Sequence, residues 1–367
     1  MRRGQLIDGR KSSEDKRVKM KNWKLRNLRT AGVLLLLPAV LAGCQRQQMP
    51  AEERIHIGVT YYNRSDTYLS ELLEDFKQDV RQQEENGIHT AVTVTDAGGS
   101  QKTQNDQVKE LIDAGCNVLC VNLVDRSAPS EIIDLAREKD ISVIFFNREP
   151  VAEDLMQQDG LYYVGADAKE SGVMQGELAA EWIRDHPEID RNRDGKIQYV
   201  VLEGEPGHQD AIIRTENAVD TLRNEGIELE KLSYQMANWN RAQAQNRMEQ
   251  MISQYQNGIE LVLANNDDMA LGAMDAYRKR NYTESALPVF FGIDGTKEGL
   301  QAVRDSRMAG TVYNDKEGQA EAMARLAVSL VTGEGMEEIE FEKEKYIYLP
   351  YTKITQENVS SFWQEEE

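Results

Sequence analysis

Short runs of apolar residues alternate with longer segments of amphipathic spacing along most of the chain. Ile55–Thr60 is a short run rich in β-branched residues, Leu261–Ala264 is apolar throughout, and both have the length of a strand. Segments such as Tyr68–Glu84 and Arg241–Tyr255 repeat apolar residues at three- and four-residue intervals, as a helix with one buried face does. Continuous apolar strands between amphipathic helices are typical of parallel sheets covered on both faces. The pattern therefore predicts an α/β fold.

The number of alternating units predicts two lobes. There are more βα units than one doubly wound sheet usually needs, so we expect two Rossmann-like lobes with parallel sheets. No G-x-G-x-x-G or G-x-x-x-x-G-K-[ST] follows an expected strand, which disfavours a dinucleotide or P-loop site. The expected strands are 55–60, 90–95, 117–123, 142–146, 162–164, 197–202, 229–235, 261–264, 289–293, 310–312 and 346–349. The expected helices are 68–84, 102–114, 129–139, 172–185, 210–225, 241–255, 269–280, 297–306 and 316–330.

The first 43 residues differ from the rest in charge. They hold 11 Lys and Arg but 3 Asp and Glu, whereas residues 44–367 carry a formal net charge of −28. An acidic body argues against a nucleic-acid partner, because phosphate binding needs a basic face. Basic residues precede the apolar run Ala31–Leu41, which is short for a membrane span and has the flanks of a signal peptide. We predict a signal peptide over residues 1–43, with Met20 as an alternative start.

The apolar run ends in Leu41-Ala42-Gly43-Cys44, which resembles the lipobox of bacterial lipoproteins. The resemblance implies lipidation of the Cys44 thiol, with residues 44–53 as a polar tether. The expected location is therefore extracytoplasmic, on the outer face of the cell membrane or in a periplasm. An ordinary signal peptide with a chance cysteine, or a short anchor helix, is the alternative.

Two cysteines remain in the body of the chain, Cys116 and Cys120. They lie four positions apart at the start of an expected strand. Extended chain separates such residues too far for a disulfide, so we expect buried, unpaired thiols.

Polar and aromatic residues gather directly after expected strands. Open α/β sheets bind ligands outside the carboxyl ends of their strands, so these residues are the candidate binding groups. They include no evident nucleophile. Asp, Asn, His and Arg pair with vicinal hydroxyls, and aromatic rings cover the apolar faces of a pyranose. The positions are Tyr61, Tyr62, Asp66, Tyr68, Asn147, Arg148, His208, Asp210, Asn265, Asn266, Asp267, Asp294, Asn314 and Asp315.

Several spaced blocks of sequence point to one family. They are Ile57-Gly-Val-Thr60, Gln104-Asn-Asp-Gln107, Val121-Asn-Leu-Val-Asp125, Phe145-Phe-Asn147, Tyr162-Tyr-Val-Gly165 with Lys169-Glu-Ser-Gly172, Gly204-Glu-Pro-Gly-His208, Ala264-Asn-Asn-Asp267, and Ala309-Gly-Thr-Val312 with Asn314-Asp315. Each block is weak alone. In this order and spacing, over Ile55–Phe362, the chain resembles the galactose/glucose-binding family of bacterial periplasmic proteins, within the type I periplasmic binding proteins.

The resemblance implies two lobes that enclose one hexose, either D-galactose, D-glucose or a methyl galactoside. It implies three crossover segments, near Ala166, Asn314 and Tyr348. The N-terminal lobe would comprise residues 54–165 and 315–347, and the C-terminal lobe residues 166–314 and 348–367.

The family's sugar contacts carry over position by position. They fall on Asp66, Tyr68, Asn147, His208, Asp210, Arg214, Trp239, Asn266, Asp294 and Asn314. Tyr68 stands where the family usually has phenylalanine. Tyr68 and Trp239 would sandwich the sugar ring, while Arg214 and the carboxylates would make charge-assisted hydrogen bonds to its hydroxyls.

A second motif resembles a calcium loop. Residues 190–198 match the first nine positions of an EF-hand loop, with Gly195 at the sharp turn. Position 12 is Val201, so the usual bidentate glutamate is missing, and the family resemblance supplies Glu260 instead. The implied ligands of a structural Ca²⁺ are Asp190, Asn192, Asp194, the Lys196 carbonyl, Gln198 and Glu260. A metal-free Asx turn is the alternative.

Together these features predict a monomeric substrate-binding lipoprotein that delivers a sugar to the permease subunits of an ABC importer and is not an enzyme. Sugar is expected to close the cleft by hinge motion. A sugar sensor that presents the closed form to a chemoreceptor or sensor kinase is the alternative. A sugar-processing enzyme is less favoured, because no catalytic pair of carboxylates stands out. A sugar-responsive repressor would need a helix-turn-helix where this chain has its signal.

Overall fold

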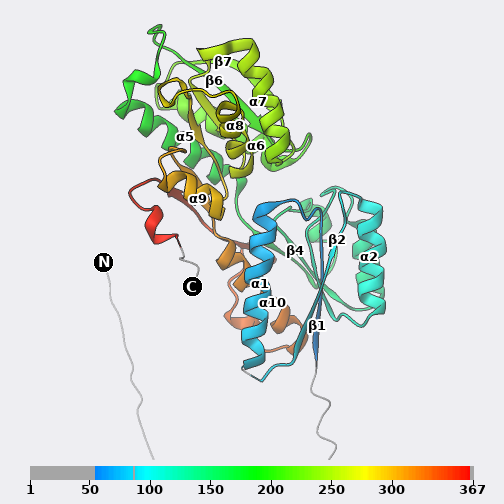
Figure 1. Ribbon diagram of the computed structural model, residues 1–367. Helices are drawn as coiled ribbons and strands as arrows, with labels where there is room; N and C mark the ends of the chain where they lie inside the picture. Colours follow the sequence, from blue (N-terminus) through cyan, green and yellow to red (C-terminus); the bar gives the residue numbers. More distant parts are fainter. Residues whose placement is uncertain (1–53, 86, 364–367) are drawn as a thin grey trace, which may run out of the picture. The chain divides into compact units, whose positions relative to one another are not determined.

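Two parallel sheets organise the protein, as the computed structural model shows (Figure 1). The structure describes residues 54–85 and 87–363. The predicted signal peptide, the lipidation site Cys44 and the tether lie outside the described residues. The described residues form one compact unit.

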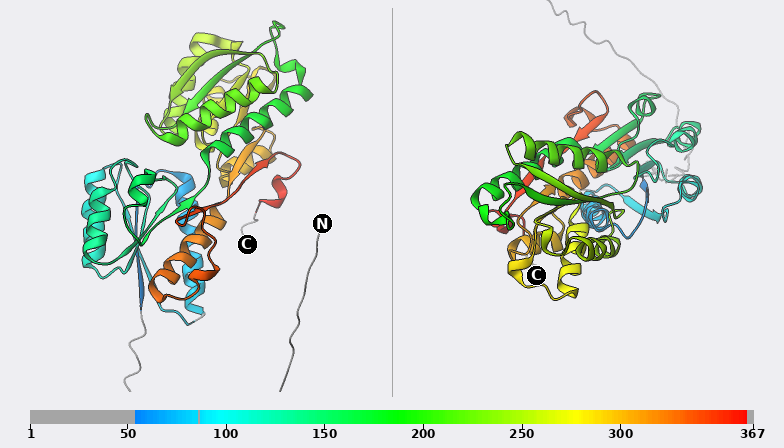
Figure 2. Two further views of the ribbon diagram at one scale, coloured as in Figure 1. Left: turned by 180° about the vertical axis from the view of Figure 1, so that it is seen from behind. Right: turned by 90° about the horizontal axis from the view of Figure 1, so that it is seen from above.

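The first sheet has the strand order β11-β5-β4-β3-β1-β2, and every neighbouring pair is parallel. We call this sheet and its helices the first lobe. Figures 1 and 2 show α1 and α10 on one face of the sheet and α2 on the other. Its strands are β1 (Ile55–Tyr61), β2 (Thr90–Asp96), β3 (Val118–Val121), β4 (Ser142–Phe146), β5 (Leu161–Gly165) and β11 (Tyr346–Tyr348). Its helices are α1 (Thr67–Glu85), α2 (Gln101–Asp113), α3 (Ser130–Glu138), α4 (Ala152–Leu155) and α10 (Lys316–Thr332).

The second sheet has the parallel order β7-β6-β8-β9. We call this sheet and its helices the second lobe. Its strands are β6 (Ile197–Glu203), β7 (Leu229–Met236), β8 (Leu261–Ala264) and β9 (Val289–Phe291). Its helices are α5 (Ala168–Asp185), α6 (Gln209–Asn224), α7 (Arg241–Tyr255), α8 (Asp267–Lys279) and α9 (Lys297–Arg304). Short 3-10 turns lie at Pro187–Ile189, Gln256–Gly258, Glu284–Ala286, Met336–Glu338 and Val359–Ser361.

Burial follows the apolar pattern of the sequence. All four residues of β3 are buried, and so are all four of β8, as expected for strands covered on both faces. On α1, Leu69, Leu72 and Phe76 are fully buried and form one apolar stripe. Fully burying each such side chain contributes about 1.5–3 kcal/mol to stability. The predicted α/β class with parallel sheets in two lobes is confirmed.

The chain passes between the two sheets three times. The passes lie between β5 and α5, between β10 (Thr311–Asn314) and α10, and between β11 and β12 (Tyr351–Ile354). Strands β10 and β12 pair with each other in antiparallel fashion, with Thr311 opposite Ile354 and Asn314 opposite Tyr351. These passes bring both sheets to a common region, where the cavity described below lies.

Every predicted strand and helix is present, but their ends shift. The largest shift is at α5, which begins at Ala168 rather than at Gly172. Asp167 caps this helix, since its side chain accepts the backbone N–H of Lys169 at 2.8 Å. The sequence did not predict α4 or β12, which are each four residues long.

The two described cysteines are buried, unpaired thiols. Burial raises the pKa of Cys116 to about 11 and that of Cys120 still further. Neither is therefore a reactive thiolate at neutral pH. Within the described residues, no helix combines the length and the apolar character that a membrane span requires.

Candidate functional site

A cavity of about 30 Å³ lies where the carboxyl ends of strands from both lobes meet. Nine of the ten predicted sugar contacts line it. Tyr62, Asp66, Tyr68, Asn147 and Arg148 come from the first lobe, and His208, Asp210, Arg214, Trp239, Asn266 and Asp294 come from the second. The position after the strands is the one that open α/β sheets use for ligands.

The first-lobe residues are held by hydrogen bonds to their own lobe. One carboxylate oxygen of Asp66 accepts the backbone N–H of Leu69 at 2.9 Å, and the other accepts the Tyr62 hydroxyl at 2.7 Å. The Oδ1 of Asn147 accepts from Asn122 Nδ2 at 2.9 Å. The side chains are thereby oriented before any ligand enters.

A buried cation lies at the second-lobe side of the cavity. Arg214, carried by α6, donates from Nη1 to the carbonyl of Asn265 at 2.7 Å and from Nη2 to the Tyr351 hydroxyl at 3.1 Å. Its Nη1 also lies 3.6 Å from Oδ1 of Asp294. Burial raises the pKa of Asp294, and the Arg214 guanidinium opposes that shift. The cavity therefore contains one buried donor, Arg214, and one buried acceptor, Asp294, which are in place before a ligand binds.

His208 is a neutral hydrogen-bond donor. Its Nδ1 accepts the backbone N–H of Asp210 at 3.2 Å, which places the ring proton on Nε2. Burial holds the pKa of His208 well below its usual range, and the nearby Arg148 and Arg214 act in the same direction. The ring meets that of Trp239 edge to face, with centroids 5.2 Å apart.

Three cavity residues hold a backbone conformation that is uncommon for residues with a side chain. The φ angles are 59° for Asn147, 59° for Trp239 and 117° for Asp294. Such strain is retained where the surrounding structure fixes a side chain for function. Gly204 makes room for Trp239, because a Cβ on Gly204 would lie 2.0 Å from the indole.

Tyr62 and Arg148 were candidate binding groups because both follow strands, but the family resemblance did not include them among the sugar contacts. The Arg148 guanidinium lies 3.5 Å above the centre of the Tyr62 ring and donates to the Val124 carbonyl at 2.9 Å. Its Nη2 lies 3.0 Å from the Glu205 carboxylate of the second lobe. The signal in the sequence that could have indicated a contact is their position just after β1 and β4.

Asn314 is the predicted contact that the structure does not place among the cavity-lining residues. Its side chain is buried, and its Oδ1 accepts Gln319 Nε2 at 2.7 Å. Its backbone N–H donates to the Asp294 carbonyl at 3.0 Å. In this structure Asn314 therefore supports the strained backbone at Asp294.

The predicted calcium ligands gather in one loop. The Asp190 carboxylate accepts the backbone N–H groups of Asp194 and Gly195, at 3.2 and 2.9 Å. Asn192 and Gln198 donate to Asp194 Oδ2 at 3.0 and 2.9 Å. Lys196 is exposed, and since its side chain is a cation it could contribute only its carbonyl to a metal.

Glu260 lies beside this loop, as the family resemblance implied. Its two oxygens accept the backbone N–H groups of Arg191 and Gln198, at 2.7 and 3.1 Å. Among the described residues, no three His, Cys, Asp or Glu side chains form a metal-binding group by themselves. A cation here would therefore depend on amide and carbonyl oxygens as well as carboxylates, a donor set that fits Ca²⁺.

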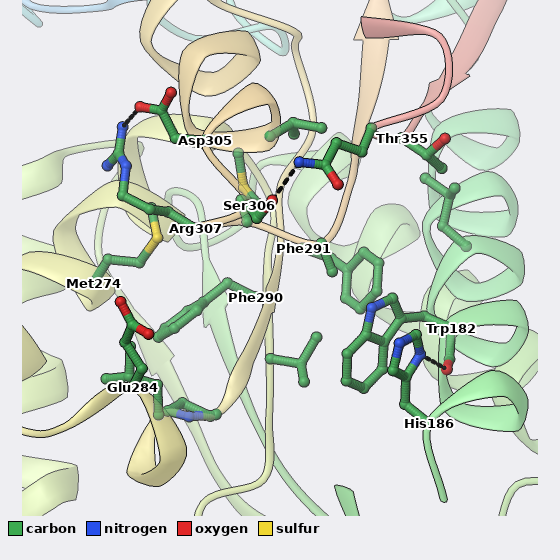
Figure 3. Close-up of a pocket in the computed structure, with 18 of the residues that line it drawn as sticks. Trp182, His186, Met274, Glu284, Phe290, Phe291, Asp305, Ser306, Arg307 and Thr355 are labelled. Atoms are coloured by element: carbon green, nitrogen blue, oxygen red, sulfur yellow. Dashed lines mark hydrogen bonds and ion pairs between the residues drawn. The ribbon is translucent and has the colours of Figure 1, made fainter.

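A larger hollow, of about 1160 Å³, lies elsewhere in the second lobe (Figure 3). Trp182 and His186 stack there with ring centroids 4.0 Å apart, and Arg307 pairs with Asp305 at 3.5 Å. None of the predicted sugar contacts lines this hollow. The small cavity remains the candidate site because it combines aromatic rings with convergent buried polar groups.

Comparison with known proteins identifies the family. A family model described as the periplasmic binding protein domain matches residues 57–335. The D-galactose/methyl-galactoside binding periplasmic protein of Haemophilus influenzae is 35% identical over 337 residues, which cover 91% of this chain and 99% of that protein. The chain belongs to the periplasmic binding protein family. This periplasmic binding protein is also 28% identical to the ribose import binding protein of Bacillus subtilis, over 62% of this chain and 67% of that one.

Solved structures agree on the fold of this periplasmic binding protein. An ABC transporter solute binding protein from Bacillus halodurans, solved with bound myo-inositol, matches with a TM-score of 0.71 and 25% identity, over 86% of this chain and 99% of that chain. One from Actinobacillus succinogenes, solved with bound D-allose, matches with a TM-score of 0.70 and 20% identity, over 84% and 99%. Its relatives are transport proteins rather than enzymes, and the expectation that this chain is not an enzyme is confirmed.

Proposed function

We propose that this protein binds one hexose in the cavity between its lobes and delivers it to an ABC importer. D-galactose, D-glucose or a methyl galactoside are the ligands that we favour. The observation that carries the proposal is the convergence of Tyr68 and Trp239 with the buried Arg214 and Asp294 in one cavity. The similarity to a galactose-binding relative over 91% of the chain supports the choice of sugar.

The cavity offers complementary groups for a pyranose. The rings of Tyr68 and Trp239 cover apolar ring faces, while Asp210 and Asp294 accept hydrogen bonds from sugar hydroxyls. Arg214 and His208 donate to ring or hydroxyl oxygens. A buried site of this kind rejects ligands without hydroxyls, because its own polar groups would then be unpaired.

Ligand entry requires motion. The cavity is small, about 30 Å³, and most of the side chains that line it are buried. We expect a hexose to enter when the two lobes separate or the lining side chains move. Three chain passes between the sheets form the natural hinge.

The proposal includes an anchor and a metal. Lipidation at Cys44 would hold the protein at the outer face of the membrane, close to its permease. In the loop, Asp190, Asn192, Asp194, Gln198 and Glu260 would hold Ca²⁺ together with the Lys196 carbonyl. The ion would supply a hard positive charge that joins the loop to β8 and stabilises the second lobe.

The test is calorimetric titration of residues 50–367 with D-galactose, D-glucose, myo-inositol and D-ribose. We expect hexose binding with a Kd of about 10 μM or tighter, and at least roughly 100-fold weaker ribose binding. Trp239→Ala should abolish measurable binding. Trp182→Ala, which removes an indole from the unrelated hollow, should not. A folded sample that gives no heat with any of the four sugars would refute the hexose assignment.

A further inference from the structure

Tyr68 carries a buried hydroxyl that has no hydrogen-bond partner in the structure. The residue is 4% exposed, lines the cavity and lies in the first turn of α1. Leaving a buried hydroxyl unpaired is destabilising, because the group loses its hydrogen bonds to water and gains none. A phenylalanine would offer the same ring face without that cost. A tyrosine at this position therefore needs a partner for its hydroxyl.

The other tyrosine of the cavity differs in this respect. The Tyr62 hydroxyl donates to Asp66 at 2.7 Å and is satisfied within the protein. Around Tyr68, Arg214 Nε and Trp239 Nε1 are also buried without a partner, so the hydroxyl is one of three such atoms among the cavity-lining residues. Arg214 directs Nη1 to Asn265 and Nη2 to Tyr351, and it lies against Asp294. The protein thus leaves the Tyr68 hydroxyl for a group that enters the cavity.

The hydroxyl is a neutral donor at every working pH. Burial raises the pKa of Tyr68 well above its ordinary value, and Tyr351 and Asp294 add to the shift. The phenol therefore keeps its proton and can donate to a hydroxyl oxygen, while its own oxygen can accept. A sugar hydroxyl has both the donor and the acceptor that this group lacks.

We propose that the Tyr68 hydroxyl binds one hydroxyl of the sugar and makes this protein select ligands that carry a hydroxyl at that ring position. The inference rests on the proposed function and deepens it. Tyr68 then has two roles. Its ring covers a face of the sugar, and its hydroxyl makes a hydrogen bond to one hydroxyl of the sugar ring. A resident water on the Tyr68 hydroxyl is the competing explanation, and it predicts no such selectivity.

The first experiment compares Tyr68→Phe with Tyr277→Phe in residues 50–367. Tyr277 is a matched control, because its hydroxyl is also buried without a partner but lies in the second-lobe core, outside the cavity lining. Without ligand, both variants should be as stable as the parent or slightly more so. With the tightest-binding sugar of the panel, Tyr68→Phe should bind about 5- to 100-fold more weakly. Tyr277→Phe should bind unchanged.

The second experiment identifies the sugar position. The parent and Tyr68→Phe are titrated with analogues of that sugar that each lack one hydroxyl. Against the parent, every deoxy analogue that loses a contact should bind more weakly. With Tyr68→Phe, the analogue that lacks the hydroxyl bound by Tyr68 should lose at least about fivefold less affinity than it loses with the parent. The other analogues should lose as much affinity with Tyr68→Phe as with the parent.

The outcomes separate the two proposals. If the parent binds none of the sugars, the proposed function fails. If the parent binds a hexose and Tyr68→Phe binds it equally well, the function stands and the role of the Tyr68 hydroxyl is overturned. If Tyr68→Phe binds all deoxy analogues with the parent's pattern of losses, a water or a structural effect replaces the proposed contact.

Discussion

Asp267 shows how much a single buried acid can influence stability. It lies in the first turn of α8, fully buried. One oxygen accepts the Thr311 hydroxyl at 2.6 Å, and the other accepts the Thr296 backbone N–H at 2.8 Å and its hydroxyl at 3.3 Å. Gly292 and Gly299 leave room for it, because a Cβ on either would lie 2.1 Å from a carboxylate oxygen. The site is built around this side chain.

The pKa of Asp267 predicts stability that falls as pH rises. Burial raises this pKa from 3.8 to about 7, so the folded state keeps a proton that the unfolded state releases above about pH 4. The contribution is fully present below pH 4 and is lost as pH rises through about 7. We expect this carboxyl by itself to lower the free energy of unfolding, measured in urea, by up to about 4 kcal/mol between pH 4 and 8.

Variants isolate this effect. Asp267→Asn should flatten the decrease, although Asp75 and Asp268, whose pKa values burial raises to about 6, retain part of it. Asp220→Asn, which changes an exposed carboxylate, should leave the slope as in the parent protein. A parent protein whose stability rises steadily from pH 5 to 8 would contradict the prediction.

At the residue scale, the sequence predicted most of the side chains that line the cavity, but it did not predict every role of these side chains. Asp66 lines the cavity and also caps α1, and Asn266 lines it and caps α8 by accepting the Met269 N–H at 3.0 Å. These caps are local and readable from sequence. The pairing of Arg148 with Glu205 joins residues far apart in sequence, so no local pattern could predict it.

The loop at Asp190–Gln198 is the element whose geometry depends most on one distant residue. Glu260 accepts two loop N–H groups and so connects the loop to the start of β8. The Arg191 side chain strengthens the connection, donating to the Ala286 and Leu287 carbonyls at 3.1 and 3.2 Å and also to the Ile259 carbonyl. The loop is therefore held from two sides by hydrogen bonds between side chains and backbone.

Removal of a bound calcium ion should destabilise this element first. We expect a chelator to lower the Tm of residues 50–367, and Ca²⁺ but not Mg²⁺ to restore it, because the loop offers many flexible oxygen ligands. Glu260→Gln should lower stability by about 1–3 kcal/mol and abolish the response to the chelator. Glu228→Gln, at an exposed position nearby in the same lobe, is the control and should respond as the parent does. An unchanged Tm in chelator would establish the metal-free loop.

The bounds of helices and strands were predictable where the pattern of apolar residues was clear. Helices α1 and α7 and strands β4 and β8 have the expected bounds within one residue. The missed β12 contains Thr352 and Lys353 and follows Pro350, so its sequence lacks an apolar run. It forms because β10 offers an antiparallel partner, which is a tertiary cause.

At the scale of the whole molecule, polar contacts at the cavity and outside it join the two lobes. The Thr67 hydroxyl at the start of α1 donates to Asp268 of α8 at 2.7 Å. The backbone N–H of Lys297 donates to Glu71 at 3.1 Å, and Arg148 pairs with Glu205. Because these contacts need no ligand, they stabilise the closed arrangement on their own. The more these contacts favour the closed form, the less of the sugar's binding free energy is needed to close the lobes.

The contact between Thr67 and Asp268 gives the sharpest test of this idea. Thr67→Val keeps the shape of the side chain but removes the donor, so the closed form loses about 1 kcal/mol relative to an open form in which Asp268 is hydrated. Fewer molecules are then closed before sugar binds, and the apparent affinity falls by the same factor, about two- to tenfold.

Small-angle X-ray scattering of Thr67→Val without sugar should show a larger radius of gyration than the parent, and saturating sugar should restore the parent value. Thr93→Val, which removes a hydroxyl that bonds His56 at 2.9 Å within the first lobe, should change neither quantity. A weaker affinity with an unchanged radius would mean that Thr67 acts on the cavity through α1 rather than on closure.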